Sequence, residues 1–329
     1  MTDRRRVLGP PADVVSVRVS RAYTASFAGQ RRGQQNQPER DQVGPRRMQA
    51  DEVLSHPASL SGQQLWAHPL VPTRGRHEMA KIVVIGGTGL IGSKVVSKLN
   101  AHGHEAIAAS PNTGVNTLTG EGPADALAGA DVVVDVSNSP SFAPDDVMEF
   151  FTTSTKTLLR AEAAAGVKHH VALTIVGTNR PQSIPYFAAK VAQEKLIRDS
   201  GIDYSLVHAT QFFEFLGSIA DISTDGKTVR LPGGLVQPIA AEDVATAVAR
   251  TAAGAPQGDI EIAGPEAFGM DEFVRRGLAF RNDPREVVRD DSAPYYGAQI
   301  EERTLVPVDG AQIFETRLED WLPLNPPRK

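Results

Sequence analysis

The sequence contains no cysteine, which excludes disulfide bonds, thiolate nucleophiles and cysteine-ligated metal sites. Long apolar runs are also missing: no stretch approaches the roughly 18 to 20 residues that a membrane-spanning helix needs. We therefore expect no membrane partner. Hydrophobic residues nevertheless make up 41% of the 329 residues and charged residues 22%, which is typical of a globular protein with a sizeable core. We expect a cytoplasmic protein that is a monomer or a homodimer.

Lysine is absent from residues 1–78, which hold twelve Arg and seven acidic residues. This segment lacks sustained periodicity and would bury too little apolar surface to offset its ordering entropy. We expect it to be disordered or a spurious N-terminal extension, with initiation at Met79; a transit peptide is less favoured because of its acids. Residues 79–329 carry a net charge of −10, and such a body repels phosphate backbones, so we expect no nucleic-acid partner.

From Lys81 onward, patterns of strand and helix alternate. The expected strands are 81–85, 105–109, 131–136, 169–176 and 204–207, and the expected helices are 90–99, 145–165, 186–200, 241–253 and 270–279. This alternation predicts an α/β fold, a Rossmann-type doubly wound parallel sheet within residues 79–325. The adjacent His169 and His170 suggest a metal pair, but neighbours on a strand point to opposite faces, so we expect no metal site.

The strand at 81–85 runs directly into Gly86-Gly-Thr-Gly-Leu-Ile-Gly92 and then into an apolar-periodic helix. Gly86 permits the tight turn, Gly89 lets a pyrophosphate approach the backbone, and Gly92 allows the helix to pack closely on the strand. Unpaired N–H groups and the helix dipole favour phosphates at this point. The sequence therefore predicts a dinucleotide site, with contacts from Gly86, Thr88, Gly89, Leu90, Ile91 and Gly92.

The second strand ends in Ala109-Ser110-Pro111-Asn112, without the acid that NAD-preferring sites place there for the ribose 2′-hydroxyl. Ser110 or Asn112 could donate a hydrogen bond to a 2′-phosphate, although no nearby Arg completes such a site. We therefore predict that NADP(H) is preferred over NAD(H). Ser137 and Asn138 lie just past the end of a central strand, where open α/β sheets bind ligands, and are further predicted cofactor contacts.

The chain resembles the short-chain dehydrogenase/reductase superfamily, and within it the atypical, NmrA-like NAD(P)-binding proteins, from about Lys81 to Leu322. The resemblance rests on the glycine loop and on four later segments: 129–135, Tyr186-Phe-Ala-Ala-Lys190, 238–245 and 262–266. It implies that Tyr186 exchanges a proton with the substrate oxygen and that Lys190 supplies a cation beside it and holds the nicotinamide ribose. Thr174 would orient the substrate carbonyl. No residue is assigned to the asparagine that completes the set in typical relatives.

The resemblance also implies a small C-terminal substrate lobe, contributed mainly by residues 211–325. Thr210 and Phe212 are predicted to contact the cofactor or substrate, and the aromatic cluster 212–215 suggests a small, largely apolar substrate. The favoured function is an NAD(P)H-dependent reductase of a small carbonyl or quinone-like substrate. The alternative is a non-catalytic NADP(H)-binding redox sensor that reports to a protein partner. An epimerase or dehydratase is less favoured, because little chain follows His208 to build a nucleotide-sugar lobe.

Overall fold

The computed structural model describes residues 79–180 and 183–326, so the expectation for residues 1–78 lies outside the described residues. The strands are β1 (Lys81–Ile85), β2 (Glu105–Ala109), β3 (Val132–Asp135), β4 (His169–Ile175), β5 (Tyr204–Ala209), β6 (Thr224–Asp225), β7 (Thr228–Leu231), β8 (Leu235–Val236), β9 (Gly258–Ala263), β10 (Phe268–Gly269), β11 (Glu286–Arg289) and β12 (Gln312–Ile313). The helices are α3 (Gly92–Ala101), α4 (Pro123–Ala126), α5 (Pro144–Ala165), α6 (Pro185–Arg198), α7 (Leu216–Ile222), α8 (Ala241–Ala253), α9 (Met270–Phe280) and α10 (Leu318–Leu324). Two 3₁₀ helices, η1 (Pro111–Thr113) and η2 (Phe213–Phe215), complete the elements.

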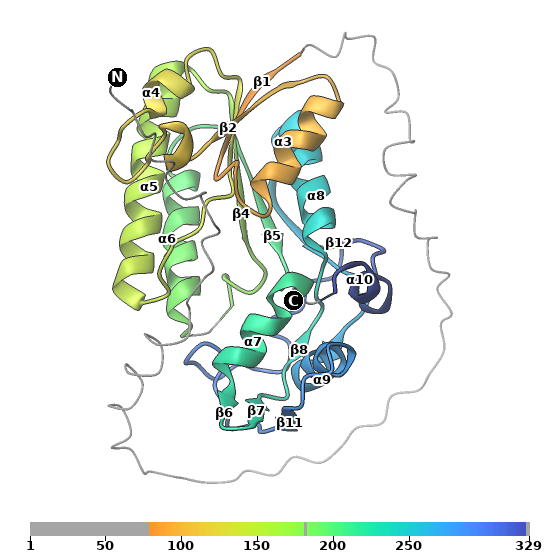
Figure 1. Ribbon diagram of the computed structural model, residues 1–329. Helices are drawn as coiled ribbons and strands as arrows, with labels where there is room; N and C mark the ends of the chain where they lie inside the picture. The colour runs from red at the N-terminus through yellow and green to blue at the C-terminus, as the bar shows by residue number, and fades with distance from the viewer. Residues whose placement is uncertain (1–78, 181–182, 327–329) are drawn as a thin grey trace, which may run out of the picture. The chain divides into compact units, whose positions relative to one another are not determined.

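Seven strands form one sheet in the order β12-β9-β5-β4-β3-β1-β2, and every neighbouring pair is parallel (Figure 1). Ile85 at the end of β1 lies beside Ala109 of β2 on one side and Asp135 of β3 on the other. After β1 the chain adds β2 on one side of β1 and then crosses to the other side of β1 to add β3. The strand order therefore reverses at β1. Ligands of open α/β sheets bind at such a reversal. The predicted Rossmann-type sheet is confirmed.

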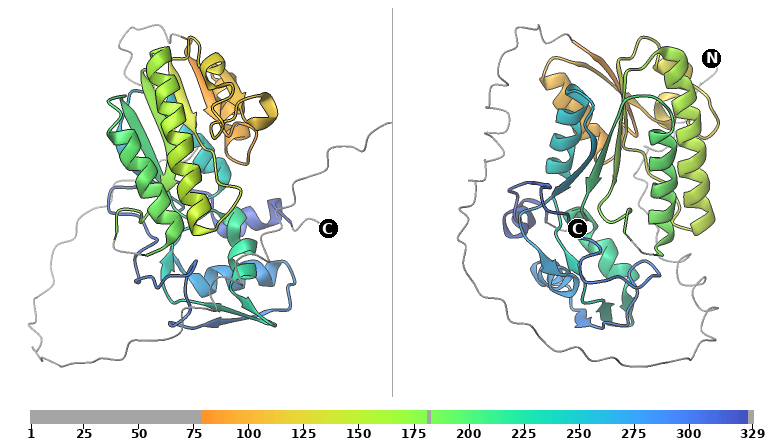
Figure 2. Two further views of the ribbon diagram at one scale, coloured as in Figure 1. Left: turned by 90° about the vertical axis from the view of Figure 1, so that its left-hand side faces the viewer. Right: turned by 180° about the vertical axis from the view of Figure 1, so that it is seen from behind.

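Helices cover both faces of this sheet (Figures 1 and 2). Helix α3 packs against α8 on one face, and α5 packs against α6 on the other. Helix α5 begins with Pro144, whose fixed φ suits the first helical position. The acidic side chains in its first turn interact favourably with the positive end of the helix dipole. It ends at Gly166, whose φ of 73° lies in the left-handed region that glycine adopts at low cost. The face beneath α5 and α6 carries the polar groups of the site.

The two histidines that begin β4 have different partners, as the strand period predicts. His169 Nε2 lies 2.9 Å from Ser205 Oγ, whereas His170 Nδ1 lies 2.9 Å from the Glu162 carboxylate of α5. Both imidazoles are buried. Within residues 79–180 and 183–326, no group of three or more His, Cys, Asp or Glu side chains is arranged to hold a metal ion.

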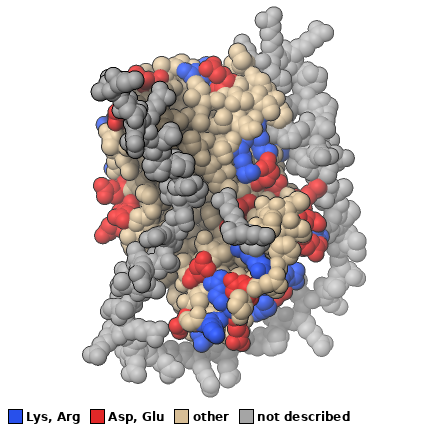
Figure 3. Space-filling model, viewed as in Figure 1, with Lys and Arg blue, Asp and Glu red and all other residues tan. Residues whose placement is uncertain are grey.

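The C-terminal lobe forms a second core beyond the carboxyl ends of the main strands. It contains the pair β8–β10 and the three-stranded sheet β11-β7-β6, packed with α7, α9 and α10 (Figure 1). The lobe does not take all of residues 211–325, because α8, β9 and β12 return to the main sheet. On the face in Figure 3, charges of both signs lie interspersed over the lobe. On α9, Arg275 and Arg276 both pair with Glu272.

Of the helices in the part of the chain that the structure describes, none has the length and hydrophobicity needed to cross a membrane.

Candidate cofactor and catalytic site

Close backbone contacts at Gly86 and Gly92 build the loop after β1. A Cβ on Gly92 would lie 2.2 Å from the carbonyl oxygen of Gly86, and a Cβ on Gly86 would lie 2.9 Å from the backbone of Ser137. Gly86 also has a φ of +77°, which favours glycine. These contacts place the start of α3 against β1 and bring the loop beside the end of β3, so Ser137 lies next to the predicted cofactor site.

The backbone N–H groups of Thr88, Leu90 and Ile91 are available to a ligand. Among the described residues, none of the three donates to a carbonyl group, whereas Gly89 N–H donates to Gly86 O at 2.9 Å. A Cβ on Gly89 would meet only that oxygen, at 3.2 Å, so the outer side of the loop is open. Unpaired amides at a helix N-terminus attract anions. The loop therefore fits the pyrophosphate of a dinucleotide.

The end of β2 is tied to the same loop. Gly86 N–H donates to Ala109 O at 2.9 Å, and the backbone N–H of the buried Ser110 donates to Thr113 Oγ1 at 2.8 Å. Asn112 lies exposed on η1. The segment 110–114 contains neither a carboxylate nor a cationic side chain, so its polar contacts to a ribose or phosphate would come from hydroxyl, amide and backbone groups.

Tyr186 lies in the first turn of α6 and reaches across to the loop after β3. Its Oη donates a hydrogen bond to Asn138 Oδ1 at 2.5 Å. Burial raises the pKa of Tyr186 above its ordinary value, and Tyr296 and Asp135 act in the same direction. The phenol therefore stays protonated through neutral pH, the state that a general acid requires. Asn138, predicted only as a cofactor contact, is thus also the partner of the predicted proton donor.

Lys190 lies one turn further along α6 and is almost fully buried. Its Nζ donates to the backbone oxygen of Leu173 at 2.9 Å and to Gln193 Oε1. Burial lowers the pKa of Lys190 to about 8, although the carboxylates of Asp135 and Glu194 oppose this effect. The ammonium form therefore predominates at pH 7 and is lost above about pH 8.

Thr174 has a different partner from the one that its predicted role requires. Its hydroxyl donates to Glu194 Oε1 at 2.5 Å, and Thr178 donates to the same oxygen at 3.0 Å. Glu194 is buried, and His208 Nδ1 lies 3.8 Å from it. Since the proton of Thr174 is already donated, that hydroxyl cannot also donate to a substrate oxygen in this arrangement. The geometry joins Asn138, not Thr174, to the hydroxyl of Tyr186.

The predicted contacts after β5 lie at different depths. Thr210 is buried and its hydroxyl donates to Gln237 O at 2.6 Å. Phe212 is half-buried and stacks on Phe215, with ring centroids 5.2 Å apart. Phe213 is 1% exposed within the lobe core, so it does not line a substrate pocket, contrary to our expectation for the aromatic cluster. The pattern of three nearby aromatics does not reveal which of them packs inward.

A different set of aromatic rings surrounds Tyr186. Phe142, in the loop before α5, lies 5.7 Å from the Tyr186 ring and 6.3 Å from the Tyr296 ring, and Phe151 meets Tyr186 edge-on at 5.6 Å. Tyr296 has a φ of 45°, which is unusual for a bulky residue and marks a constrained loop. The sequence reasoning missed Phe142 and Tyr296 because they are far from the motifs. Substrate near Tyr186 would meet mainly aromatic surface.

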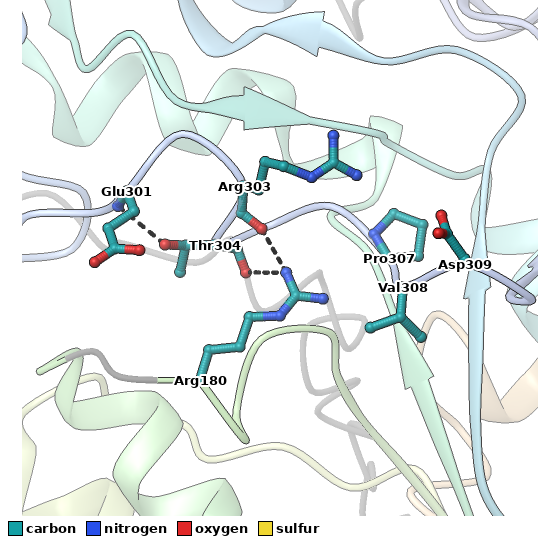
Figure 4. A pocket seen from close by; sticks show the side chains of 7 residues that line it. All are labelled: Arg180, Glu301, Arg303, Thr304, Pro307, Val308 and Asp309. Carbon is teal, nitrogen blue, oxygen red and sulfur yellow. Dashed lines mark hydrogen bonds between the residues drawn. The ribbon is translucent and has the colours of Figure 1, made fainter. Parts of the chain in front are cut away.

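A pocket of about 460 Å³ opens at the carboxyl end of the sheet, between the loop after β4 and the loop 301–309 (Figure 4). Arg180 reaches across it and donates to the backbone oxygens of Arg303 and Thr304, the latter at 3.0 Å. A Cβ on Gly177 would lie 2.3 Å from the same Thr304 oxygen. These contacts hold the 301–309 loop tightly against the end of β4.

A family described as NAD(P)H-binding matches residues 86–254, more than half of the chain. The chain belongs to this NAD(P)H-binding family. The match spans the glycine loop, the Tyr186–Lys190 helix and α8, and it confirms the predicted relationship to the NmrA-like, atypical short-chain dehydrogenase/reductases.

Curated relatives match part of the chain. Divinyl chlorophyllide a 8-vinyl-reductase of Cucumis sativus is 29% identical over 203 residues, which cover 51% of this chain and 48% of that protein. Photosystem II assembly factor Ycf39 of Cyanophora paradoxa is 25% identical over 163 residues, which cover 45% of this chain and 51% of that protein. The chain thus spans about half the length of these curated relatives.

Solved structures show the same fold at low sequence identity. A dTDP-4-dehydrorhamnose reductase from Clostridium acetobutylicum has a TM-score of 0.55 and 14% identity, covering 74% of this chain and 92% of that one. The Bordetella bronchiseptica enzyme WbmH in complex with NAD+ has a TM-score of 0.52 and 16% identity, covering 66% and 87%. At these identities the likeness shows the fold alone.

Proposed function

We propose that the protein is an NAD(P)H-dependent oxidoreductase that reduces a small carbonyl or quinone-like substrate and prefers NADP(H). The observation that carries this proposal is the protonated Tyr186 hydroxyl, which is held by Asn138 beside the loop that fits a dinucleotide. A protein that only bound the dinucleotide would not require a proton donor in this place. The aromatic surface of Phe142 and Tyr296 favours an apolar, planar substrate. The expected cytoplasmic location and the monomeric or homodimeric state stay predictions.

The residues of the chain have separate tasks in this reaction. The bound nicotinamide supplies the hydride that reduces the substrate carbon. Asn138 holds the phenol in position before the substrate enters. In the reaction, the Tyr186 hydroxyl turns from Asn138 Oδ1 to the substrate oxygen and donates its proton there as negative charge develops. Lys190, four residues further along α6, would contribute the positive charge that stabilises the resulting tyrosinate.

Tyr186→Phe tests the proposal directly. NADPH oxidation is measured against a panel of small aldehydes, ketones and quinones, with cofactor affinity followed separately by NADPH fluorescence. Since general acid catalysis contributes on the order of 100-fold or more, kcat should fall by at least about 100-fold while the NADPH Kd stays within about twofold. Tyr204→Phe, which removes a hydroxyl from β5, is the matched control and should retain full activity.

Two outcomes of this assay would contradict the proposal. Equal turnover by wild type and Tyr186→Phe would show that Tyr186 is not the proton donor. Tight NADPH binding by wild type without turnover of any substrate would favour the redox sensor.

The cofactor preference has its own test. Asn112→Asp places a carboxylate after β2, where it would repel a 2′-phosphate but accept a hydrogen bond from a ribose 2′-hydroxyl. We expect the Kd for NADPH to rise about 10-fold while the Kd for NADH is unchanged or lower, as measured by fluorescence titration. NADH serves as the internal control. Equal affinity of the wild-type protein for NADPH and NADH would show that the preference does not exist.

A further inference from the structure

The environment of Lys190 contains a chain of hydrogen bonds that the sequence motif does not include. Lys190 Nζ donates to Gln193 Oε1, and Gln193 Nε2 donates to Asp135 Oδ2 at 2.9 Å. Asp135 Oδ1 accepts from the backbone N–H of Ser137 at 3.0 Å and from its hydroxyl at 2.6 Å. These hydrogen bonds thus connect the end of β3 to the ammonium group on α6. Lys190, Gln193 and Asp135 are each no more than 3% exposed.

Asp135 determines which group donates and which accepts at its end of this series of hydrogen bonds. An ionised carboxylate only accepts hydrogen bonds, so the Gln193 carboxamide must turn its NH₂ group toward Asp135. The carbonyl oxygen of Gln193 then faces Lys190, where an acceptor is required. The ammonium favours the same orientation, so the Gln193 amide is held by the charges at both of its ends. Without the carboxylate, the NH₂ group of Gln193 would lose its charged acceptor.

The remaining contacts of Lys190 leave one donor. An ammonium group has three N–H donors, and here two donate to Leu173 O and Gln193 Oε1. The ring of Phe151 lies 4.4 Å from Nζ and contributes a cation–π contact without using a donor in a hydrogen bond. No third acceptor for Nζ occurs within the residues that the structure describes. One N–H therefore remains for a group that enters the site.

We propose that Asp135 is a positioning residue that acts through Gln193 to hold the Lys190 ammonium with its third N–H directed at the bound cofactor. This inference rests on the proposed function only for the role of Lys190 in turnover; its effect on cofactor binding is independent of turnover. The Asp135 carboxylate also balances the buried charge of Lys190.

Other ionisable groups near Lys190 have their own partners. Glu194, on the same helix, accepts from Thr174 and Thr178. His170 of β4 is held by Glu162 of α5. The side chain that α5 itself directs at Nζ is the uncharged ring of Phe151. Asp135 is therefore the carboxylate that is connected to Lys190 by hydrogen bonds through a single bridging group.

Gln193→Met tests this inference, because methionine has nearly the same shape and cannot join the two charges. The NADPH Kd of the full chain is measured by fluorescence between pH 6 and pH 9.5. In wild type, the Kd should rise about 10-fold above pH 8, where Lys190 loses its proton. In Gln193→Met, the Kd should be higher already at pH 7, and the inflection should move about one unit lower, since the ammonium loses an acceptor.

Two further variants separate positioning from general stability. Asp135→Asn should move the inflection in the same direction, because it removes the negative charge that Gln193 connects to the ammonium. Gln299→Met, which replaces a glutamine on an exposed loop, should leave both the Kd and the inflection unchanged. A purely structural role would lower the melting temperature and raise the Kd equally at all pH values.

The inference is overturned if Gln193→Met and wild type have the same inflection, or if the wild-type Kd does not change up to pH 9.5. A shifted inflection in a protein without turnover would leave the inference standing and reject the reductase.

Discussion

A methyl group at position 92 should unfold the cofactor loop, whereas a methyl group at position 89 should leave the fold intact and abolish cofactor binding. In Gly92→Ala the new Cβ would lie 2.2 Å from the Gly86 carbonyl oxygen and 2.7 Å from Gly87 Cα, both of which are backbone atoms that cannot rotate away. Such overpacking costs about 3 kcal/mol of unfolding free energy, or roughly 150-fold in the folding equilibrium. Urea denaturation measures it.

Gly89→Ala isolates binding from folding. Its Cβ would meet only the Gly86 oxygen, at 3.2 Å, so the unfolding free energy should change by less than about 1 kcal/mol. The methyl group would, however, occupy the open side of the loop where a pyrophosphate approaches the unpaired amides. We expect the NADPH Kd to rise more than roughly 100-fold, because the displaced phosphates lose several charge-assisted hydrogen bonds.

Gly103→Ala is the control for both substitutions. Gly103 has a φ of +85° and would have no atom within 4 Å of a new Cβ, so only backbone strain of about 1 kcal/mol applies. Its NADPH Kd should match that of wild type. Wild-type affinity in Gly89→Ala would show that the dinucleotide does not approach this loop.

The elements that sequence alone predicted accurately have strong local signals where they end. Strands β1 and β2 and helix α8 have the predicted bounds, because their apolar or periodic runs are followed by Gly86, by Ser110-Pro111 and by Gly254. β12, by contrast, is a two-residue strand in a polar segment, and it exists because β9 offers an open edge. Pairing of that kind depends on tertiary structure, so no local pattern reveals it.

The residues of the site likewise divide into those with a local sequence signal and those brought together only by folding. The glycine loop and the pair Tyr186–Lys190 were predictable because each is contiguous in the sequence. The partners of these residues were not: Asn138 and Asp135 come from another strand and meet α6 only after folding. Gln193 lies three residues beyond Lys190, a spacing that places both on one helical face, and this was the one signal that could have found it. Thr174 fitted the motif, yet Glu194 takes its hydroxyl proton.

Removing the carboxylate of Glu162 should produce the largest loss of stability beneath the site. Glu162 and His170 are both fully buried, and the imidazole lies 2.9 Å from one carboxylate oxygen and 3.0 Å from the other. Breaking a buried pair by removing one partner costs about 3–5 kcal/mol, so Glu162→Ala should lower the unfolding free energy by this amount at pH 6. Glu149→Gln, at an exposed position of α5, should change it by less than about 0.5 kcal/mol.

The pH dependence of this pair has a definite sign. Burial opposes the charge of His170, but the charge and hydrogen bond of Glu162, together with the charge of Asp135, outweigh burial and raise the pKa of His170 above the unfolded value of 6.5. The pair therefore contributes its full stability below pH 6.5 and loses it as the pH rises through the folded pKa. In Glu162→Gln the carboxylate is gone and burial disfavours the charge, so stability should instead fall as the pH drops below 6.5.

The difference between wild type and Glu162→Gln is thus expected to be largest near pH 5.5 and to shrink toward pH 9. His169 enters this comparison only through its neighbour. Burial, followed by the charge of His170, lowers the pKa of His169 to about 4, so His169 removes stability between pH 6.5 and 4 in both proteins, and only the part due to His170 differs between them. Guanidinium unfolding curves at pH 5.5, 7 and 9 give the three differences. A difference that stays constant with pH would mean that His170 is neutral throughout, and that the two residues form a neutral hydrogen bond beneath Asp135 and Lys190 instead of an ion pair.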